Sequence, residues 1–363
     1  MGKTIFINGR FLTQPVTGVQ RYSLELLRSI DSILVAQGTP QDVRFVCLAP
    51  PEPFEHPGWQ KIEICRVGRN KGNLWEQVDL AFHARGELLF SPANIGPFYY
   101  RNQVVTIHDA SVFAVPAAYS GTFRAKYAFV FQSLVKHARQ IITDSLFSQQ
   151  ELAHYLKVSP ERFTVITLGS DHLNHIQPDS RILAQHQLEK DSYLLIVASR
   201  SAHKNLANVF EALKYVTQPV KVVAVGGSYK QVFQKTEQQT YPANVKMLDY
   251  VNDQQLKALY ENALGFIFPS IYEGFGLPVL EAMRCGCPVL CSNAASLPEV
   301  AGNAALYFDP HQPQKIAQAF NDFLSTPATH TQWRIQGQAQ ANKFSWSTTA
   351  SRIIDILLNL VSS

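Results

Sequence analysis

Residues 269–302 read PSIYEGFGLPVLEAMRCGCPVLCSNAASLPEVAG, and this stretch is the most densely patterned part of the 363-residue chain. An apolar run, GFIF, precedes it and predicts a strand that ends at Pro269. Gly274 and Gly276 then open the backbone, and Pro278 suits the first helical turn, where its missing N–H costs nothing. A glycine-rich loop that leads into a helix presents free backbone N–H groups, which suit a phosphate or a sugar oxygen.

A carboxylate lies on each side of this loop in the sequence. Glu273 precedes the first glycine, and Glu281 follows eight residues later on the predicted helix. Carboxylates in such a crevice are suited to accept hydrogen bonds from vicinal hydroxyls, as ribose and sugars offer. The alternative is that Glu273 is an ordinary loop charge and Glu281 a carboxylate on the helix face.

Strand-like runs alternate with longer amphipathic stretches along the whole chain. The runs of the first half lie at residues 3–9, 43–49, 87–92, 103–109, 140–145 and 163–169. After a polar segment at 171–191, further runs lie at residues 193–199, 220–226, 245–251, 265–270, 287–292 and 304–309. This alternation predicts parallel sheets covered by helices. The expected fold class is therefore α/β, with two Rossmann-like domains facing each other across a cleft.

Composition excludes several classes of protein. Hydrophobic residues make up 46% and charged residues 17%, which is too apolar for a disordered chain. The net charge of +4 is small for a nucleic-acid binder. No run of about 18 apolar residues predicts a membrane span, and the N-terminus lacks the pattern of a secretory signal. The odd number of cysteines, five, favours a reducing compartment, and no Asp-x-Asp metal motif occurs.

The motifs resemble those of a known family. EGFGLPVLEAM resembles the E-x7-E signature of retaining glycosyltransferases of family 4, which have the GT-B fold. FPSIYEGFG, CGCPV, SLPEVAG and AALYFDP resemble the donor domain of that family. TGVQRYSLELL, VVTIHDAS, ITDSLFSQQEL and VITLGSD resemble its N-terminal domain, so the likeness covers nearly the whole chain. SRSAHKNL and FPSIYEGFGLPVLE resemble most the mannosyltransferase-type branch that builds bacterial polysaccharides.

The resemblance implies two domains and a donor site. An acceptor domain is expected at residues 1–171, with a terminal helix at 344–363 returning to it, and a donor domain at 172–343. Glu273 is implied to face the donor sugar, and Lys204 to place positive charge beside the leaving diphosphate. The other residues implied to bind the donor are Gly18, Ser199, Arg200, Tyr250, Val251, Gly274, Phe275, Gly276, Leu277 and Glu281. Many members carry an arginine where this chain has Ala198, which leaves open whether Arg200 replaces it.

The first domain is implied to contribute a histidine. His108 follows a strand, at the position where family members place a histidine near the donor sugar. Asp109 could orient its ring or serve the acceptor, and Arg21 is a weaker acceptor candidate or a surface residue of the first helix. The catalytic set implied by the resemblance is His108, Lys204 and Glu273, without a metal.

The implied reaction moves a hexose from a nucleotide-diphosphate sugar to a glycan or lipid-linked oligosaccharide, with retention, in cell-surface polysaccharide synthesis. GDP-mannose is the first expectation for the donor and a UDP-sugar the second. The alternatives are a sugar-nucleotide binder without turnover and a GT-B sugar-nucleotide epimerase. No cofactor is expected, and the oligomeric state stays open.

Localisation is expected to be cytoplasmic, with possible contact at the inner face of the plasma membrane. Residues 120–139, SGTFRAKYAFVFQSLVKHAR, mix cations with aromatic residues, as a helix on an anionic membrane would. The alternative is a domain helix that packs its aromatic side chains inward.

Overall fold

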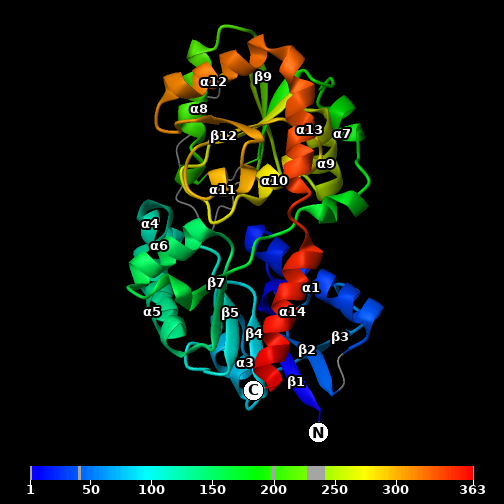
Figure 1. Ribbon diagram of the computed structural model, residues 1–363, viewed down its shortest axis with the longest axis vertical. Coiled ribbons are helices and arrows are strands. Elements are labelled where there is room, and N and C mark those ends of the chain that lie inside the picture. Colours follow the sequence, from blue (N-terminus) through cyan, green and yellow to red (C-terminus); the bar gives the residue numbers. More distant parts are fainter. Residues whose placement is uncertain (1, 40–41, 198–200, 227–241, 363) are drawn as a thin grey trace. The chain divides into compact units, whose positions relative to one another are not determined.

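The computed structural model describes residues 2–39, 42–197, 201–226 and 242–362, which form two compact units (Figure 1). Unit 1 consists of Met1–Ala110, Ala125–Gly169 and Ser345–Ser363, and unit 2 of Ser111–Arg124 and Ser170–Phe344. The segment Ser111–Arg124 follows a strand of unit 1 in the chain but packs within unit 2, which a boundary drawn along the sequence does not anticipate.

Unit 1 contains a seven-stranded, all-parallel sheet with the order β3-β2-β1-β4-β5-β6-β7. Its strands are β1 (Lys3–Asn8), β2 (Val43–Ala49), β3 (Ile62–Arg66), β4 (Leu88–Ser91), β5 (Gln103–Thr106), β6 (Gln140–Thr143) and β7 (Phe163–Val165). β3 is not among the strands that the sequence predicts. This strand lies at the sheet edge with only Ile62 buried, so it lacks the apolar run that marks the central strands.

One face of this sheet is covered by α1 (Gly18–Gln37) and α14 (Trp346–Ser362), which pack against each other (Figure 1). The Thr349 hydroxyl donates to the Thr167 carbonyl at 2.6 Å, and the Tyr22 and Trp346 rings meet edge to face at 5.9 Å. The final helix of the chain therefore belongs to unit 1.

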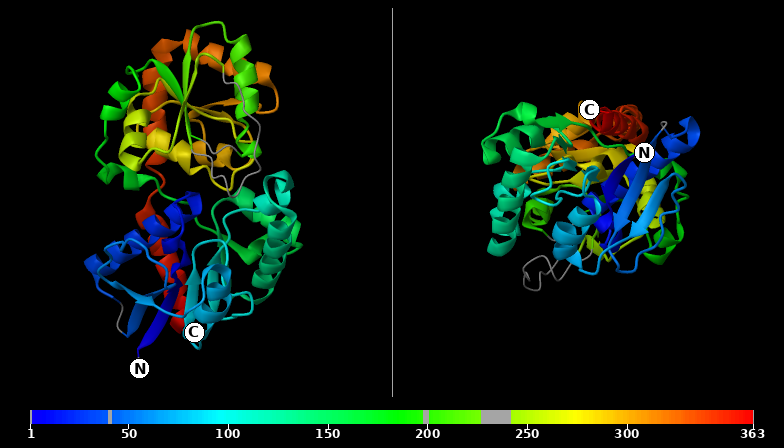
Figure 2. Two further views of the ribbon diagram at one scale, coloured as in Figure 1. Left: turned by 180° about the vertical axis from the view of Figure 1, so that it is seen from behind. Right: turned by 90° about the horizontal axis from the view of Figure 1, so that it is seen from below.

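The opposite face carries α2 (Gly72–Leu74), the π-helix η2 (Trp75–Asp79) and α3 (Leu80–His83), seen from behind in Figure 2. Strand order explains this placement. The connection from β1 to β2 moves toward one edge of the sheet, and the connection from β3 to β4 moves toward the other edge. Because crossover connections are right-handed, the two connections lie on opposite faces of the sheet. Further helices of this unit are η1 (Gly9–Thr13), α5 (Gly121–His137), which begins in unit 2, α6 (Leu146–Leu156) and η4 (Pro160–Arg162). Ser145 caps α6 by accepting from the Ser148 N–H at 3.0 Å.

Unit 2 contains a six-stranded, all-parallel sheet with the order β10-β9-β8-β11-β12-β13. Its strands are β8 (Tyr193–Val197), β9 (Lys221–Val225), β10 (Val245–Leu248), β11 (Gly265–Phe268), β12 (Val289–Ser292) and β13 (Ala305–Phe308). Its helices are α4 (Ser111–Ala114), η3 (Pro116–Ala118), η5 (Asp171–His175), α7 (Arg181–Gln185), η6 (Ala202–Lys204), α8 (Leu206–Ala212), η7 (Leu213–Tyr215), α9 (Asp253–Asn262), α10 (Leu277–Arg284), α11 (Leu297–Ala301), α12 (Pro313–Ser325), η8 (Pro327–Thr329) and α13 (His330–Ala341). The expected fold class, two Rossmann-like parallel-sheet domains, is confirmed.

Each core follows from strands that are apolar on both faces. In unit 2, Leu194, Ile267 and Leu290 of three neighbouring strands are fully buried in one cluster with Phe320 of α12. Such burial leaves polar chemistry to the loops at the carboxyl ends of the strands. Among the described helices, none combines the length and apolar content needed to cross a bilayer.

Candidate active site

The loop between β11 and α10 is held rigidly at the carboxyl edge of the unit 2 sheet. The Ser296 hydroxyl donates to the carbonyls of Glu273 at 3.0 Å and Phe275 at 2.8 Å. Gly276 has φ 104°, and a Cβ there would lie 2.6 Å from Cδ2 of buried Leu297, so both conformation and space require glycine. Hydrogen bonds and packing therefore hold the predicted glycine-rich turn in place. The helix α10 begins directly after this turn, and no side chain caps its first N–H groups.

Lys204 forms an ion pair with Glu273, a residue of this loop. Lys204 Nζ lies 2.5 Å from Glu273 Oε1, and the two side chains are 18% and 14% exposed. The ammonium also lies over the ring of Phe268, 5.4 Å from its centroid. Two residues predicted separately, one for a phosphate and one for a sugar, thus form a single ion pair that remains accessible.

Asn205 holds the Lys204 turn in place. It adopts a left-handed conformation with φ 59°, which asparagine tolerates better than most residues. Its Nδ2 donates to the carbonyls of Pro269 at 3.2 Å and Pro310 at 2.7 Å, and the Ile271 N–H donates to the His203 carbonyl at 2.9 Å. Asn205 was not predicted as a site residue, although its place beside Lys204 in SRSAHKN was the available signal.

Glu281 is buried on the first turns of α10 and lies between two polar rings. Its Oε1 is 3.3 Å from His172 Nε2, and its Oε2 accepts from the Tyr260 hydroxyl at 3.5 Å. Burial, together with the charge of Glu281, raises the pKa of Tyr260, so this hydroxyl keeps its proton and donates. His172 lies in the polar segment between the two strand series, and nothing in the sequence connected it to Glu281.

Of the remaining residues that the resemblance implies for donor binding, those that the structure describes make none of the contacts given above. Tyr250 is exposed and Val251 half-buried, and both follow β10 at the same carboxyl edge. Ser199 and Arg200 lie outside the described residues. Leu277 is buried as the first residue of α10.

His108 is the centre of the polar group at the carboxyl edge of the unit 1 sheet. Its Nδ1 lies 2.7 Å from Asp144 Oδ2, and its Nε2 lies 3.1 Å from the Pro92 carbonyl oxygen. The Tyr22 ring packs edge-on against it at 4.6 Å. Asp144, at the end of β6, was not predicted; the strand-end position of its ITDS motif was the signal that could have found it.

The hydrogen bonds of His108 determine its charge. The Pro92 carbonyl and the ionised Asp144 carboxylate only accept, so with Asp144 ionised both ring nitrogens of His108 carry hydrogens. Burial by itself lowers the pKa of His108, but the Asp144 carboxylate, with smaller contributions from Asp109 and the Pro92 carbonyl, outweighs it and raises the pKa. The arrangement is an imidazolium–carboxylate pair rather than a base ready to accept a proton.

The remaining unit 1 candidates lie at the start of α1 and after His108. Gly18 is exposed, and a Cβ there would meet nothing within 4 Å. Arg21 Nη1 lies 3.8 Å from Oε1 of buried Glu25, which also pairs with Arg28 at 2.7 Å. Asp109 is half-buried.

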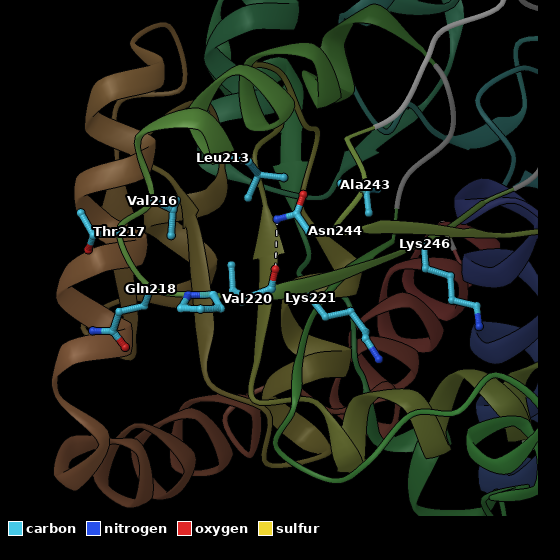
Figure 3. Close-up of a pocket in the computed structure, with 11 residues that line it drawn as sticks. Leu213, Val216, Thr217, Gln218, Val220, Lys221, Ala243, Asn244 and Lys246 are labelled. Carbon is cyan, nitrogen blue, oxygen red and sulfur yellow. Dashed lines mark hydrogen bonds between the residues drawn. The ribbon is translucent and has the colours of Figure 1, made fainter.

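A hollow of about 790 Å³ lies at the opposite end of the unit 2 strands (Figure 3). It is bordered by Val220 and Lys221 at the start of β9 and by Asn244 and Val245 at the start of β10, and Asn244 Nδ2 donates to the Val220 carbonyl at 3.1 Å. Because ligands of parallel sheets bind at the carboxyl ends of strands, this hollow is not the candidate donor site.

In the part of the chain that the structure describes, no three histidine, cysteine, aspartate or glutamate side chains are grouped where they could hold a metal ion. Cys287 and Cys291 are buried, and burial raises the pKa of Cys285 to about 12.

Two all-parallel, Rossmann-like domains with charged residues at the carboxyl edges of the sheets correspond to the GT-B fold. Residues 179–340 match the family described as glycosyl transferases group 1. The matched residues lie within unit 2, and this match, together with the relatives below, supports a glycosyltransferase.

Relatives and solved structures agree with this assignment. The O-antigen chain mannosyltransferase B of Escherichia coli is 29% identical over 379 aligned positions, covering 94% of this chain and 96% of its own. Sucrose-phosphate synthase from Thermosynechococcus elongatus has the same fold, with a TM-score of 0.74, 18% identity and full coverage of both chains. HepE of Anabaena, solved with UDP and glucose, has a TM-score of 0.74 at 17% identity, covering 99% of this chain and 100% of its own.

Proposed function

We propose that this protein is a glycosyltransferase that transfers mannose, with retention of anomeric configuration, from GDP-mannose to a glycan or lipid-linked oligosaccharide of a cell-surface polysaccharide. A UDP-hexose is the second candidate donor. The observation that carries the proposal is the accessible Lys204–Glu273 pair beside the uncapped start of α10. The name of the Escherichia coli relative, which acts on an O-antigen chain, supports the sugar and the acceptor class.

The ion pair suggests how donor binding orders the site. A diphosphate at the start of α10 competes with Glu273 for Lys204, because both are anions and only one ammonium is present in the pair. Once the phosphate takes Lys204, the Glu273 carboxylate is free to accept hydrogen bonds from sugar hydroxyls. Glu281, held between His172 and Tyr260, then accepts from the ribose hydroxyls.

Retention is proposed to follow front-face displacement. The bond between sugar and diphosphate loosens, Lys204 and the α10 N–H groups stabilise the leaving charge, and a phosphate oxygen takes the acceptor proton. No protein nucleophile is needed, so Glu273 orients the sugar. His108 acts through its position and positive charge, since both of its ring nitrogens are already hydrogen-bonded. Metal is not required in this scheme.

The decisive test measures nucleotide release and product together. The full-length protein is incubated with GDP-mannose or UDP-glucose, with a lipid-linked oligosaccharide extract, and with or without EDTA. Release of GDP, an extended α-linked product by NMR, and activity in EDTA support the proposal. Donor binding without release indicates a binder. A new sugar nucleotide formed without acceptor indicates an epimerase.

A further inference from the structure

An apolar patch lies on the outer side of unit 1. Its members are Leu74, Val78, Phe82, Tyr99 and Phe129, and between 47% and 69% of each residue is exposed. Large hydrophobic residues scattered singly on a surface need no explanation, but a contiguous group indicates an interaction site.

The patch is continuous across three segments. Leu74, Val78 and Phe82 are spaced by four along α2, η2 and α3, which places them along one side of this helical stretch. The Tyr99 hydroxyl donates to the Gln77 carbonyl of η2 at 2.6 Å. The ring of Phe98 contacts Tyr99 at 5.4 Å and Phe129 of α5 at 5.2 Å.

Buried contacts on the inner side determine which side faces outward. Trp75 Nε1 donates to the Val67 carbonyl at 2.7 Å. Glu76, also buried, accepts from Asn8 Nδ2 at 2.8 Å and from Arg10 Nη1 at 2.7 Å. A rotation that buried Leu74 and Val78 would expose Trp75 and break the Glu76 ion pair, so the outward stripe is a stable property of the fold.

The charges around the patch have one sign. The segments that carry the patch, residues 67–87, 98–102 and 125–136, contribute the exposed cations Arg69, Lys71, Arg85, Arg101 and Lys136. Their carboxylates, Glu76, Asp79 and Glu87, are all buried or half-buried and accept internal hydrogen bonds. The segments that carry the apolar patch therefore expose cations but no carboxylate.

The apolar patch does not coincide with residues 120–139, the segment that the sequence suggested for membrane contact. Within α5, Phe131 is buried, Tyr127 packs on it at 5.6 Å, and Phe123 stacks on Tyr119 at 5.3 Å. Phe129 is the exposed aromatic residue of that helix, so most of the patch comes from α2, η2 and α3.

We propose that the apolar patch docks on a membrane surface that contains anionic lipid, with its aromatic and aliphatic side chains entering the headgroup boundary and the surrounding cations meeting phosphate groups. A second copy of the chain fits this surface poorly, because the same cations would face one another. The docking deepens the proposed function by holding the enzyme where a lipid-linked acceptor lies, but vesicle binding requires no turnover, so each can fail without the other.

The test is sedimentation of the full chain with vesicles of phosphatidylcholine alone or mixed with phosphatidylglycerol. Wild type is expected to bind the mixed vesicles and not the neutral ones. The variant L74S/F82S is expected to lose at least about tenfold in partitioning, because the buried apolar area falls. The matched controls V35S, on α1, and I335S, on α13, replace residues of similar exposure away from the patch and are expected to bind like wild type.

A charge series separates lipid electrostatics from general stickiness. R69Q/K71Q/R85Q is expected to bind mixed vesicles about a hundredfold more weakly, since each cation near an anionic surface contributes roughly a fivefold factor. K190Q/K315Q/K343Q removes equal charge from exposed lysines of unit 2 and is expected to bind like wild type.

Three outcomes would overturn the proposal. They are no binding of wild type to mixed vesicles at low salt, equal binding by wild type and both patch variants, and self-association of wild type that L74S/F82S abolishes in sedimentation velocity. Thermal unfolding of every variant checks that the fold is kept; if L74S/F82S unfolds, the charge series alone decides.

Discussion

Replacing Asp144 with asparagine tests whether the His108 ring is held as an imidazolium. The carboxylate and the ring are both buried, and Oδ2 lies 2.7 Å from Nδ1. Asparagine has the same shape and can still accept from Nδ1–H, but it removes the negative charge. The substitution therefore isolates the charge of the pair from its packing.

The size of the effect follows from burial. Breaking a buried ion pair by removing one partner costs about 3–5 kcal/mol. Because asparagine keeps one acceptor, we expect the lower end, about 3 kcal/mol of lost unfolding free energy at neutral pH. Part of this loss arises because Asp144 Oδ1 is buried with no hydrogen-bond partner among the described residues, so an amide nitrogen placed there would also be unsatisfied.

The effect depends on pH with a defined sign. The pKa of His108 is raised in the folded protein, so the pair stabilises fully below the ordinary imidazole pKa of about 6.5 and loses this contribution as pH rises through the raised value. Burial raises the pKa of Asp144, so the contribution also falls in acid, as the carboxylate takes up a proton. The difference between wild type and Asp144→Asn should be largest between these limits.

Urea unfolding followed by tryptophan fluorescence measures the difference in the relevant unit, because Trp59, Trp75 and Trp346 belong to unit 1 and Trp333 to unit 2. Asp355→Asn, at an exposed carboxylate of α14 in the same unit, is the matched control and should change stability by about 0.5 kcal/mol or less, as is usual for surface substitutions. A loss below about 1 kcal/mol for Asp144→Asn, or one that does not vary between about pH 6.5 and pH 9, would refute the imidazolium assignment.

Three further substitutions address the donor side. Glu273→Gln should slow transfer about a hundredfold to a thousandfold at unchanged melting temperature, measured as nucleotide release, while Glu211→Gln, which disrupts an exposed lysine pair, should not. Glu281→Gln should weaken nucleotide binding at least about tenfold in calorimetry; a change in kcat alone would contradict its ribose role. Gly276→Ala should cost about 2–4 kcal/mol in urea unfolding, because φ is 104° and the new Cβ meets a buried leucine, whereas Gly18→Ala, with open space, should be near neutral; equal effects would refute the strain argument.

The chain's local patterns predicted much of the fold. Central strands such as β4 and β11 are apolar on both faces, so composition alone marks them, and Gly276 and Pro278 mark the turn into α10. β3 was missed because an edge strand buries only part of one face, and its alternating pattern is short and polar. The periodicity of apolar residues in a sequence reflects which side chains are buried. It therefore does not predict a strand of which only a small part is buried.

The sequence by itself therefore determined two parallel-sheet domains and a glycine-rich loop with Lys204, Glu273 and Glu281 as candidates. Only the tertiary structure decided which side chains meet. The pairs Lys204–Glu273 and His108–Asp144 join residues 69 and 36 positions apart. Neighbouring strands of a parallel sheet bring distant loops to one edge, and no local pattern encodes which of their side chains touch. The outward stripe that contains Leu74 has the same origin, because helix rotation is determined by buried partners elsewhere in the chain.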